Sequence, residues 1–260
     1  MMLYKQFLGM HFKQAYQYKV SSLLVTISSM LVSVGEIIGI WLLFQNFNTI
    51  GEWGFYESAL MFGIITSVFT FSECFFRGYD EFPNLIKTGT LDRLLVRPVN
   101  IYLQILYQKI EWTKLGRASL GLVISIFAIC NLTVQWTFLK VVVLILMYIC
   151  GVAVILGLIL ISAGVTVFTV ENLEFLHILT SGSKEVAFYP INIYKKWLRN
   201  IFTFIIPLAC FNYLPLSYIL GVGSVPMWLC AISPILGMLF VVPCFLFFRF
   251  ALSKYQGTGT

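Results

Sequence analysis

Charged residues are scarce in this chain of 260 residues, since Asp, Glu, Lys and Arg make up only 11% of it while hydrophobic residues make up 59%. An ordinary soluble domain has about 25% charged residues. The apolar residues also come in long runs rather than at the spacing of half-buried helices or strands. The composition therefore excludes a water-soluble fold and indicates an integral membrane protein.

Histidine is rarer still, with two residues, and the six cysteines include no C-x-x-C pair. This pattern excludes the ligand spacing of a zinc site and suggests no disulfide framework. An intramembrane enzyme would need a nucleophile, base or metal constellation, which the sequence does not show. We therefore expect no metal site, no catalytic residues and no enzymatic activity in this chain.

Long apolar runs predict where the chain crosses the membrane. A spanning helix needs about 20 mostly apolar residues, because its backbone polar groups must be satisfied internally. The amino terminus shows no short apolar core followed by a cleavage site, so we expect the first span to be retained. A weaker region at residues 201–220 is interrupted by Pro207 and Pro215, each of which removes a backbone hydrogen bond. The strong runs are residues 22–44, 58–76, 115–134, 138–168 and 227–248.

The positions of Lys and Arg orient these spans. The net charge of +6 gathers in the amino-terminal stretch, in the link between the second and third spans and at the carboxyl end, whereas residues 45–57 contain no Lys or Arg. This positive-inside asymmetry predicts that both termini and the link are cytoplasmic, and it argues against a nucleic-acid partner. Residues 1–20, which alternate lysines with aromatics, are expected to form a helix lying in the membrane interface.

The link between the second and third spans is the only sizeable polar segment, and residues 85–100 at its centre predict a short helix. Gly89 allows a turn, Thr90 can cap the helix and Pro98 stops it. Such a helix on the cytoplasmic face must either lie on lipid or dock to another protein. Its apolar stripe consists of Leu91, Leu94 and Leu95, and its polar side of Asp92, Arg93 and Arg97.

Two topologies fit the region from residue 168 to residue 221. On charge alone, residues 171–199 form a cytoplasmic loop, and a fifth span follows at residues 200–220. In the other topology a weak fifth span covers residues 173–189, and residues 190–221 enter the outer leaflet and turn back. Both topologies leave the last span running inward.

Several short motifs together resemble a known family. The run Gly89–Val99, Gly-Thr-Leu-Asp-Arg-Leu-Leu-Val-Arg-Pro-Val, resembles the coupling-helix region of type-2 ABC exporter permeases. The resemblance extends over nearly the whole chain, to a bacterial subgroup described as uncharacterised or multidrug transport components. Its other motifs are Tyr189-Pro190, Trp197-Leu-Arg199, Ile206-Pro-Leu208, Asn212-Tyr-Leu-Pro215 and Lys254-Tyr-Gln-Gly-Thr-Gly259.

The resemblance implies an all-α integral membrane protein with six transmembrane helices, an amino-terminal interfacial helix, a cytoplasmic coupling helix and a re-entrant outer segment before the last span. It therefore favours the second topology, with the fifth span at residues 173–189 and the re-entrant segment at residues 190–221. Lys195, Lys196 and Arg199 then lie at the outer face, against the charge rule.

In function, the resemblance implies a permease subunit of a bacterial ABC exporter in the inner or plasma membrane. Such a complex has two permeases and two ATPase subunits, and in this subgroup the second permease is often a different, related chain. The sequence contains no G-x-x-x-x-G-K-[ST] phosphate loop, so ATP and Mg²⁺ are expected to bind the partner ATPase. The implied ATPase-coupling residues are Gly89, Thr90, Leu91, Asp92, Arg93, Leu94, Leu95, Arg97 and Pro98.

Candidate residues for the translocation path or the subunit interface lie elsewhere. Glu36 is in the middle of the first span, where an ionisable group costs roughly 2 to 3 kcal/mol or more, and within the G-x-x-x-G pattern of Gly35 and Gly39, which permits close helix approach. The alternative is that Glu36 only packs, protonated or hydrogen-bonded. Glu73 and Arg77 have the spacing of an intrahelical ion pair. Glu171, Glu174 and His177 are expected to form a further polar lining or a loop near the inner end of the fifth span.

A secondary transporter or channel that needs no ATPase is the rival function. Secondary transporters often show internal repeats with broken helices and midplane charged sites. This sequence shows no convincing repeat, and the single midplane carboxylate Glu36 is little to couple an ion gradient. The nature of the transported substrate does not follow from the sequence.

Overall fold

The computed structural model describes residues 9–10, 13, 16–47, 49, 53–169, 174–222 and 225–255, with backbone only for residues 174–179. The protein is 82% helical, and the described residues contain no strand. Five helices are long and apolar enough to cross a membrane, or six if one bent helix pair counts as a span. The expectation of an all-helical, multi-pass membrane protein is therefore confirmed.

The five strong apolar runs of the sequence each form one of these helices. The first four are α2 (Lys19–Asn46), α3 (Phe55–Phe76), α7 (Lys114–Asn131) and α8 (Phe138–Thr169). The fifth combines α13 (Met227–Met238) and α14 (Val241–Ser253), which follow one another from residue 227 to residue 253.

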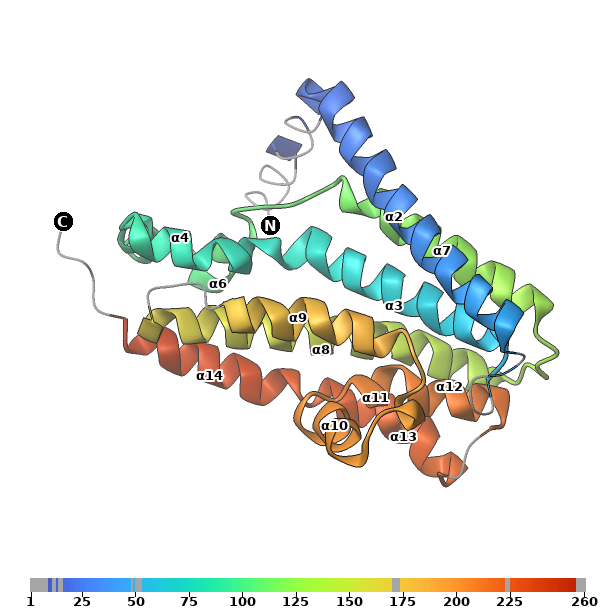
Figure 1. Cartoon of the computed structure of the whole chain (residues 1–260). Helices are drawn as coiled ribbons and strands as arrows, with labels where there is room; N and C mark the ends of the chain where they lie inside the picture. Colours follow the sequence, from blue (N-terminus) through green and yellow to red (C-terminus); the bar gives the residue numbers. More distant parts are fainter. Residues whose placement is uncertain are drawn as a thin grey trace.

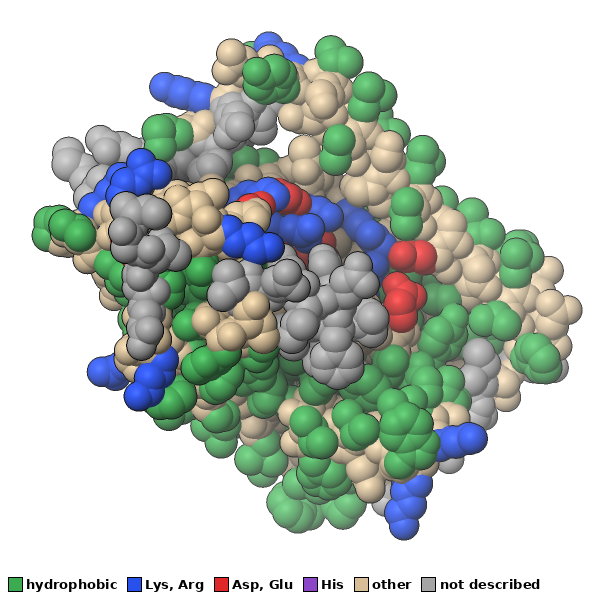
Figure 2. Space-filling view, turned by 60° about the vertical axis from the view of Figure 1, so that its left-hand side comes forward, with side chains coloured by type: hydrophobic (Ala, Val, Ile, Leu, Met, Phe, Trp, Pro, Cys, Tyr) green, Lys and Arg blue, Asp and Glu red, His purple; other side chains and the backbone are tan. Residues whose placement is uncertain are grey.

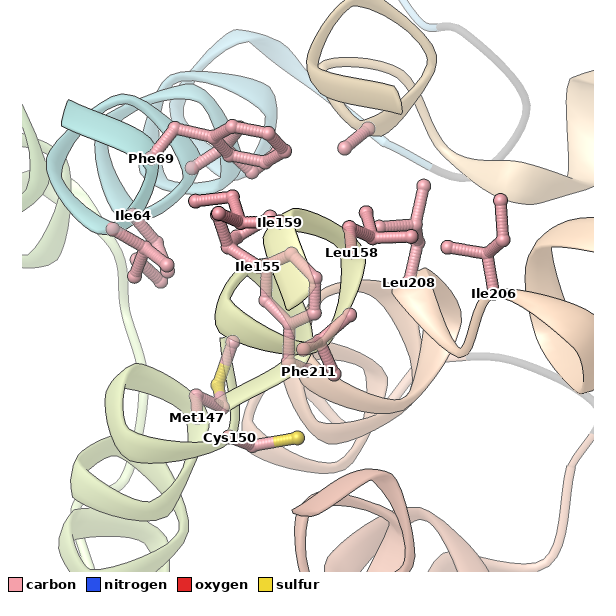
Figure 3. Packing of buried hydrophobic residues seen from close by; sticks show 14 of the residues in the cluster. Ile64, Phe69, Met147, Cys150, Ile155, Leu158, Ile159, Ile206, Leu208 and Phe211 are labelled. Atoms are coloured by element: carbon pink, nitrogen blue, oxygen red, sulfur yellow. The ribbon is translucent and has the colours of Figure 1, made fainter. Parts of the chain in front are cut away.

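Helix α3 occupies the centre of the bundle and is buried along most of its length. Helix α7 covers one side of it and α8 another, while α13 and α14 pack on α8 (Figure 1). Figure 3 shows Ile64 and Phe69 of α3 facing residues of α8 such as Ile155 and Ile159, with Phe211 close by. Bilayer-facing helices therefore surround one fully packed helix.

Three short helices follow α3 and form a layer at one end of the bundle. The 3-10 turn η1 (Arg77–Glu81) leads into α4 (Phe82–Lys87), α5 (Thr90–Leu95) and α6 (Ile101–Leu106), at the left end of Figure 1. The ring of Phe248 in α14 anchors this layer. It lies 5.5 Å from the Tyr79 ring, 5.3 Å from the Phe82 ring and 6.1 Å from the Tyr102 ring, centroid to centroid.

Residues 174–220 form one short helix and then a bent segment. Helix α9 (Glu174–Ala187) packs along α8 and runs from the α4–α6 end towards the other end of the bundle (Figure 1). The chain continues through η2 (Ile191–Ile193), α10 (Lys196–Asn200), the π-helical η3 (Ile201–Ile205), α11 (Leu208–Phe211) and α12 (Tyr213–Leu220). The two halves of this segment meet at an angle of 70°. Residues 200–220 therefore do not form one straight helix, as expected from Pro207.

Helix α2 stands at the edge of the bundle, packed mainly on α7 (Figure 1). Most of its apolar side chains are exposed, as suits a helix in contact with lipid. The interfacial helix expected at residues 1–20 falls largely outside the described residues. Of that stretch the structure describes residues 9–10, 13 and 16–20, which are helical apart from the turn at Tyr18.

The α3–α7 contact requires glycine. A Cβ added to Gly121 of α7 would lie 2.7 Å from the Ser67 backbone nitrogen and 2.8 Å from the Gly63 carbonyl oxygen of α3. A Cβ added to Gly35 of α2 would meet nothing within 4 Å. The substitution Gly121→Ala should therefore lower the free energy of unfolding in detergent by about 1 to 3 kcal/mol. Gly35→Ala is the matched control and should not destabilise the isolated chain; equal stabilities of the two variants would contradict the close α3–α7 approach.

Candidate functional site

Glu36 lies in an ion cluster formed by three helices. Arg117 of α7 donates hydrogen bonds from its Nη2 to both carboxylate oxygens of Glu36, each at 2.7 Å, and from its Nε to Ser33 Oγ. Lys184 of α9 approaches Glu36 Oε1 from the other side at 3.5 Å. Two cations therefore face the one carboxylate of Glu36.

Sequence analysis missed both partners of Glu36. The span predicted at residues 115–134 contains Arg117, which lies in the first turn of α7, but no partner was predicted for it. Sequence analysis placed Lys184 in a cytoplasmic loop under one topology and in a weak span under the other. A cation within a membrane helix needs a partner, which was the available signal for both residues. The identity of that partner depends on the three-dimensional packing of α2, α7 and α9.

A second group of charges joins the α4–α6 layer to the spans. The predicted Glu73–Arg77 pair is present at 4.0 Å, and Glu73 also accepts a contact from Lys114 of α7 at 3.2 Å. Arg77 further contacts Asp80 at 3.5 Å and Glu111 at 3.6 Å. The segment before α7 is tied in by Lys109, which lies 2.7 Å from Glu81 and 3.4 Å from Glu111. The hydrogen bond to Glu81 raises the pKa of Lys109.

A cavity of about 190 Å³ lies between α3, α8 and α9 beside these charges. Figure 2 shows Lys, Arg, Asp and Glu side chains gathered in a hollowed part of this face. The wall is apolar on the α8 side and charged near α9 and the end of α3. Its lining residues are Phe69, Glu73, Arg77, Asp80, Ile155, Leu158, Ile159, Thr180, Ser181, Lys184 and Glu185.

The remaining candidates for a polar lining are not placed by the structure. Glu171 lies outside the described residues, as do the side chains of Glu174 and His177, whose backbone belongs to α9. Within the described part of the chain, no group of three His, Cys, Asp or Glu residues is arranged to hold a metal ion.

The two glycines of the G-x-x-x-G pattern point away from the bundle. Both Gly35 and Gly39 are exposed, and an added Cβ would meet nothing within 4 Å at either position. Glu36 between them turns inward to Arg117. The pattern therefore offers a smooth outer face on α2, and within this chain it makes no helix contact of its own.

The segment with the family motif is divided between the interior and the surface. Leu91 and Leu94 are buried in the chain's own core, whereas Leu95 is 46% exposed and Val96 is 86% exposed. Arg93, Arg97 and Pro98 are exposed as well. The apolar stripe predicted for Leu91, Leu94 and Leu95 thus serves mainly to pack α5 on the rest of this chain.

The ends of α5 differ in detail from the expectation. Thr90 was expected to cap the helix, but it is the first helical residue, and Gly89 occupies the cap position with a φ of 64°. That left-handed backbone suits glycine because it has no Cβ. Residues 85–100 form the end of α4, a turn and α5 instead of one helix. The Gln104 side chain, which sequence analysis did not single out, donates to the Leu94 carbonyl at 3.1 Å and to the Val99 carbonyl at 2.9 Å.

Separating the Glu36–Arg117 pair should be costly. Arg117→Gln leaves Glu36 with only the longer contact to Lys184, and we expect the free energy of unfolding in detergent to fall by up to about 3 to 5 kcal/mol. The double variant Glu36→Gln/Arg117→Gln should lose less than the sum of the two single variants, because it leaves no uncompensated carboxylate. Arg93→Gln on the exposed side of α5 is the control, with an expected change within about 0.5 kcal/mol. A fully additive double variant would contradict the pairing.

Comparison with known proteins identifies the family. A family model described as "ABC-2 family transporter protein" matches residues 30–259. A comparison with curated proteins gives no match, and neither does one with solved structures. The matched region contains α2 from residue 30 onward and every later helix, and proteins of this family typically work with ATPase partners. The chain therefore belongs to the ABC-2 family and is a membrane-spanning permease of an ABC transport system.

Proposed function

We propose that this permease is a subunit of a bacterial ABC exporter, forms the translocation path with a second permease and is powered by separate ATPase subunits. The family match over residues 30–259 is the observation that carries this proposal. Two surfaces that the chain's own packing leaves open support it: the exposed side of α5 and the outer face of α2. In this proposal the chain performs no catalysis, and ATP and Mg²⁺ bind the partner ATPase.

The arrangement of α9 to α12 supports the topology with a re-entrant segment. Helix α9 runs along α8 away from the α4–α6 end, and the bent segment that follows turns back within the other half of the bundle and ends with α12 near the opposite end (Figure 1). We propose that α9 is the fifth span, that residues 190–221 enter the outer side and turn back, and that the α4–α6 layer and both termini are cytoplasmic. The membrane is then the bacterial inner or plasma membrane.

The ATPase contact in this proposal is the exposed edge of α5. Leu95 and Val96 present apolar side chains to solvent next to Arg93 and Arg97, which gives an apolar centre with a polar rim. Asp92 lies near Tyr255, and burial and then this carboxylate raise the pKa of the Tyr255 hydroxyl. Leu91 and Leu94 pack α5 against the core of the chain. They are unsuitable for testing the ATPase contact, because changing either would damage that core.

The substitution Leu95→Glu should weaken ATPase binding by about tenfold or more, since it places a charge at the centre of the contact. Membrane insertion and thermal stability should not change, because Leu95 is half exposed in the isolated chain. Co-purification of the ATPase with tagged permease measures the binding. ATP-driven transport in reconstituted vesicles measures its consequence for function. Leu95→Ala is the apolar control. Full ATP-driven transport by the Leu95→Glu variant would contradict docking at α5, whereas transport that does not require ATP would favour the rival function without an ATPase.

The second permease is proposed to approach the Gly35–Gly39 face of α2. Small residues spaced four apart let two helix backbones come close within a membrane, where packing and not hydrophobicity drives association. The neighbouring ion cluster around Glu36 would then lie just behind the interface, beside the cavity bordered by Lys184. In this proposal the translocation path has α2 and α9 on one side and the second permease on the other.

Gly35→Leu and Gly39→Leu should each abolish cross-linking to the second permease in native membranes, whether that permease is a copy of this chain or a related one. The isolated chain should keep its stability, because both positions are open. Val34→Leu adds bulk at an exposed position on a different side of α2 and should have no effect. If cross-linking persists in both glycine variants, the interface lies elsewhere on the protein.

A further inference from the structure

Three cations lie in or directly before the short helix α10, and none of them has an acidic partner among the described residues. Lys195 and Lys196 are exposed and Arg199 is half-buried, and none lies within 4 Å of a carboxylate in the described part of the chain. The sequence contains no Asp or Glu after Glu185. Figure 2 shows Lys and Arg side chains projecting at the lower right of the view, with no acidic side chain beside them. We call these three residues the α10 basic patch.

The segment that carries the patch is anchored at the end of the bundle away from the α4–α6 layer. The segment is held there by Asn192, whose side chain donates a hydrogen bond to the Tyr213 hydroxyl, and by the Tyr213 ring, which lies 5.6 Å from the Trp53 ring just before α3 begins. The α4–α6 layer follows the other end of α3. With 22 residues, α3 is about 33 Å long, close to the roughly 30 Å of the bilayer hydrocarbon. The anchoring contact at Asn192 therefore lies near headgroup level in the leaflet opposite the α4–α6 layer, and Lys195 follows three residues later.

Large apolar side chains are exposed alongside the cations. The exposed fraction is 62% for Trp197, 81% for Phe204, 65% for Ile205 and 49% for Ile193. An apolar surface of this kind beside cations is typical of a helix that lies in the membrane interface, with its rings at the acyl boundary and its cations towards the phosphates. Water would be a poor solvent for this surface, and the acyl–headgroup boundary a good one.

We propose that residues 193–205 form an interfacial anchor in which the α10 basic patch binds the phosphate groups of anionic phospholipids in the leaflet opposite the α4–α6 layer. Charge complementarity carries this assignment, because these three cations have no carboxylate within 4 Å in the part of the chain that the structure describes. Each cation near an anionic membrane surface strengthens binding by about fivefold. The proposal depends on the position of the segment in the membrane and not on ATPase docking or on the second permease.

A photoreactive probe in nanodiscs tests this site. Phe204 is replaced by benzoyl-phenylalanine in the full chain, in a bilayer of equal phosphatidylglycerol and phosphatidylcholine, and mass spectrometry gives the ratio of the two lipid adducts. We expect a several-fold excess of phosphatidylglycerol. The triple variant Lys195→Gln/Lys196→Gln/Arg199→Gln should reduce the ratio to about one, whereas Lys195→Arg/Lys196→Arg/Arg199→Lys should keep it.

Phe138 provides the matched probe position. It is 87% exposed and begins α8 at the same end of the bundle, outside the α10 basic patch. The phosphatidylglycerol excess should be absent there. Equal adducts at Phe204 and Phe138, an excess that survives the glutamine triple variant, or adducts at Phe204 to protein instead of lipid would each overturn the proposal. Because the wild-type comparison of the two probe positions stands alone, the test does not rest on how well the triple variant folds.

Discussion

The close backbone approach of α3 and α7 is the contact on which the rest of the structure depends. Helices in a bilayer gain little from burying apolar side chains, since lipid is equally apolar, so close packing has to hold them together. Gly63 and Gly121 allow that packing where any side chain would collide with the neighbouring backbone. The position of α7 then fixes Lys114 beside Glu73 and Arg117 beside Glu36. One contact between two small residues thus aligns both groups of charges.

Those charges form two connected groups, one at the α4–α6 layer and one at α2, with α7 in both. Lys114 in its first turn belongs to the group at the layer, and Arg117, three residues later, belongs to the group at α2. A buried ion pair adds little net stability, but separating one is expensive. The ion pairs therefore fix positions more than they add stability. If α2, α7, α9 or the α4–α6 layer moves relative to the others, the charged side chains must exchange partners.

Local features of the fold were predictable from the sequence, and features that depend on packing were not. Hydropathy located the five long helices, and the four-residue spacing identified the Glu73–Arg77 pair, because both signals are contained in one stretch of chain. Glu36 and its partners Arg117 and Lys184 are 81 and 148 residues apart, and no local pattern joins them. Periodicity likewise found the stripe of Leu91, Leu94 and Leu95 but could not tell whether its partner was the same chain or another one. The exposure of Leu95 separates it from the other two.

The double hydrogen bond of Gln104 has a mechanical consequence. By holding the carbonyls of Leu94 and Val99, this side chain closes the turn between α5 and α6 and makes the two helices a single stiff hook. Tyr102 in the same hook packs on Phe248 and Phe245 of the last span, 6.1 and 5.0 Å between ring centroids. A push on the exposed tip of α5 would therefore not be absorbed by a flexible loop. It would rotate α5 and α6 together about their contact with the aromatic rings of α14.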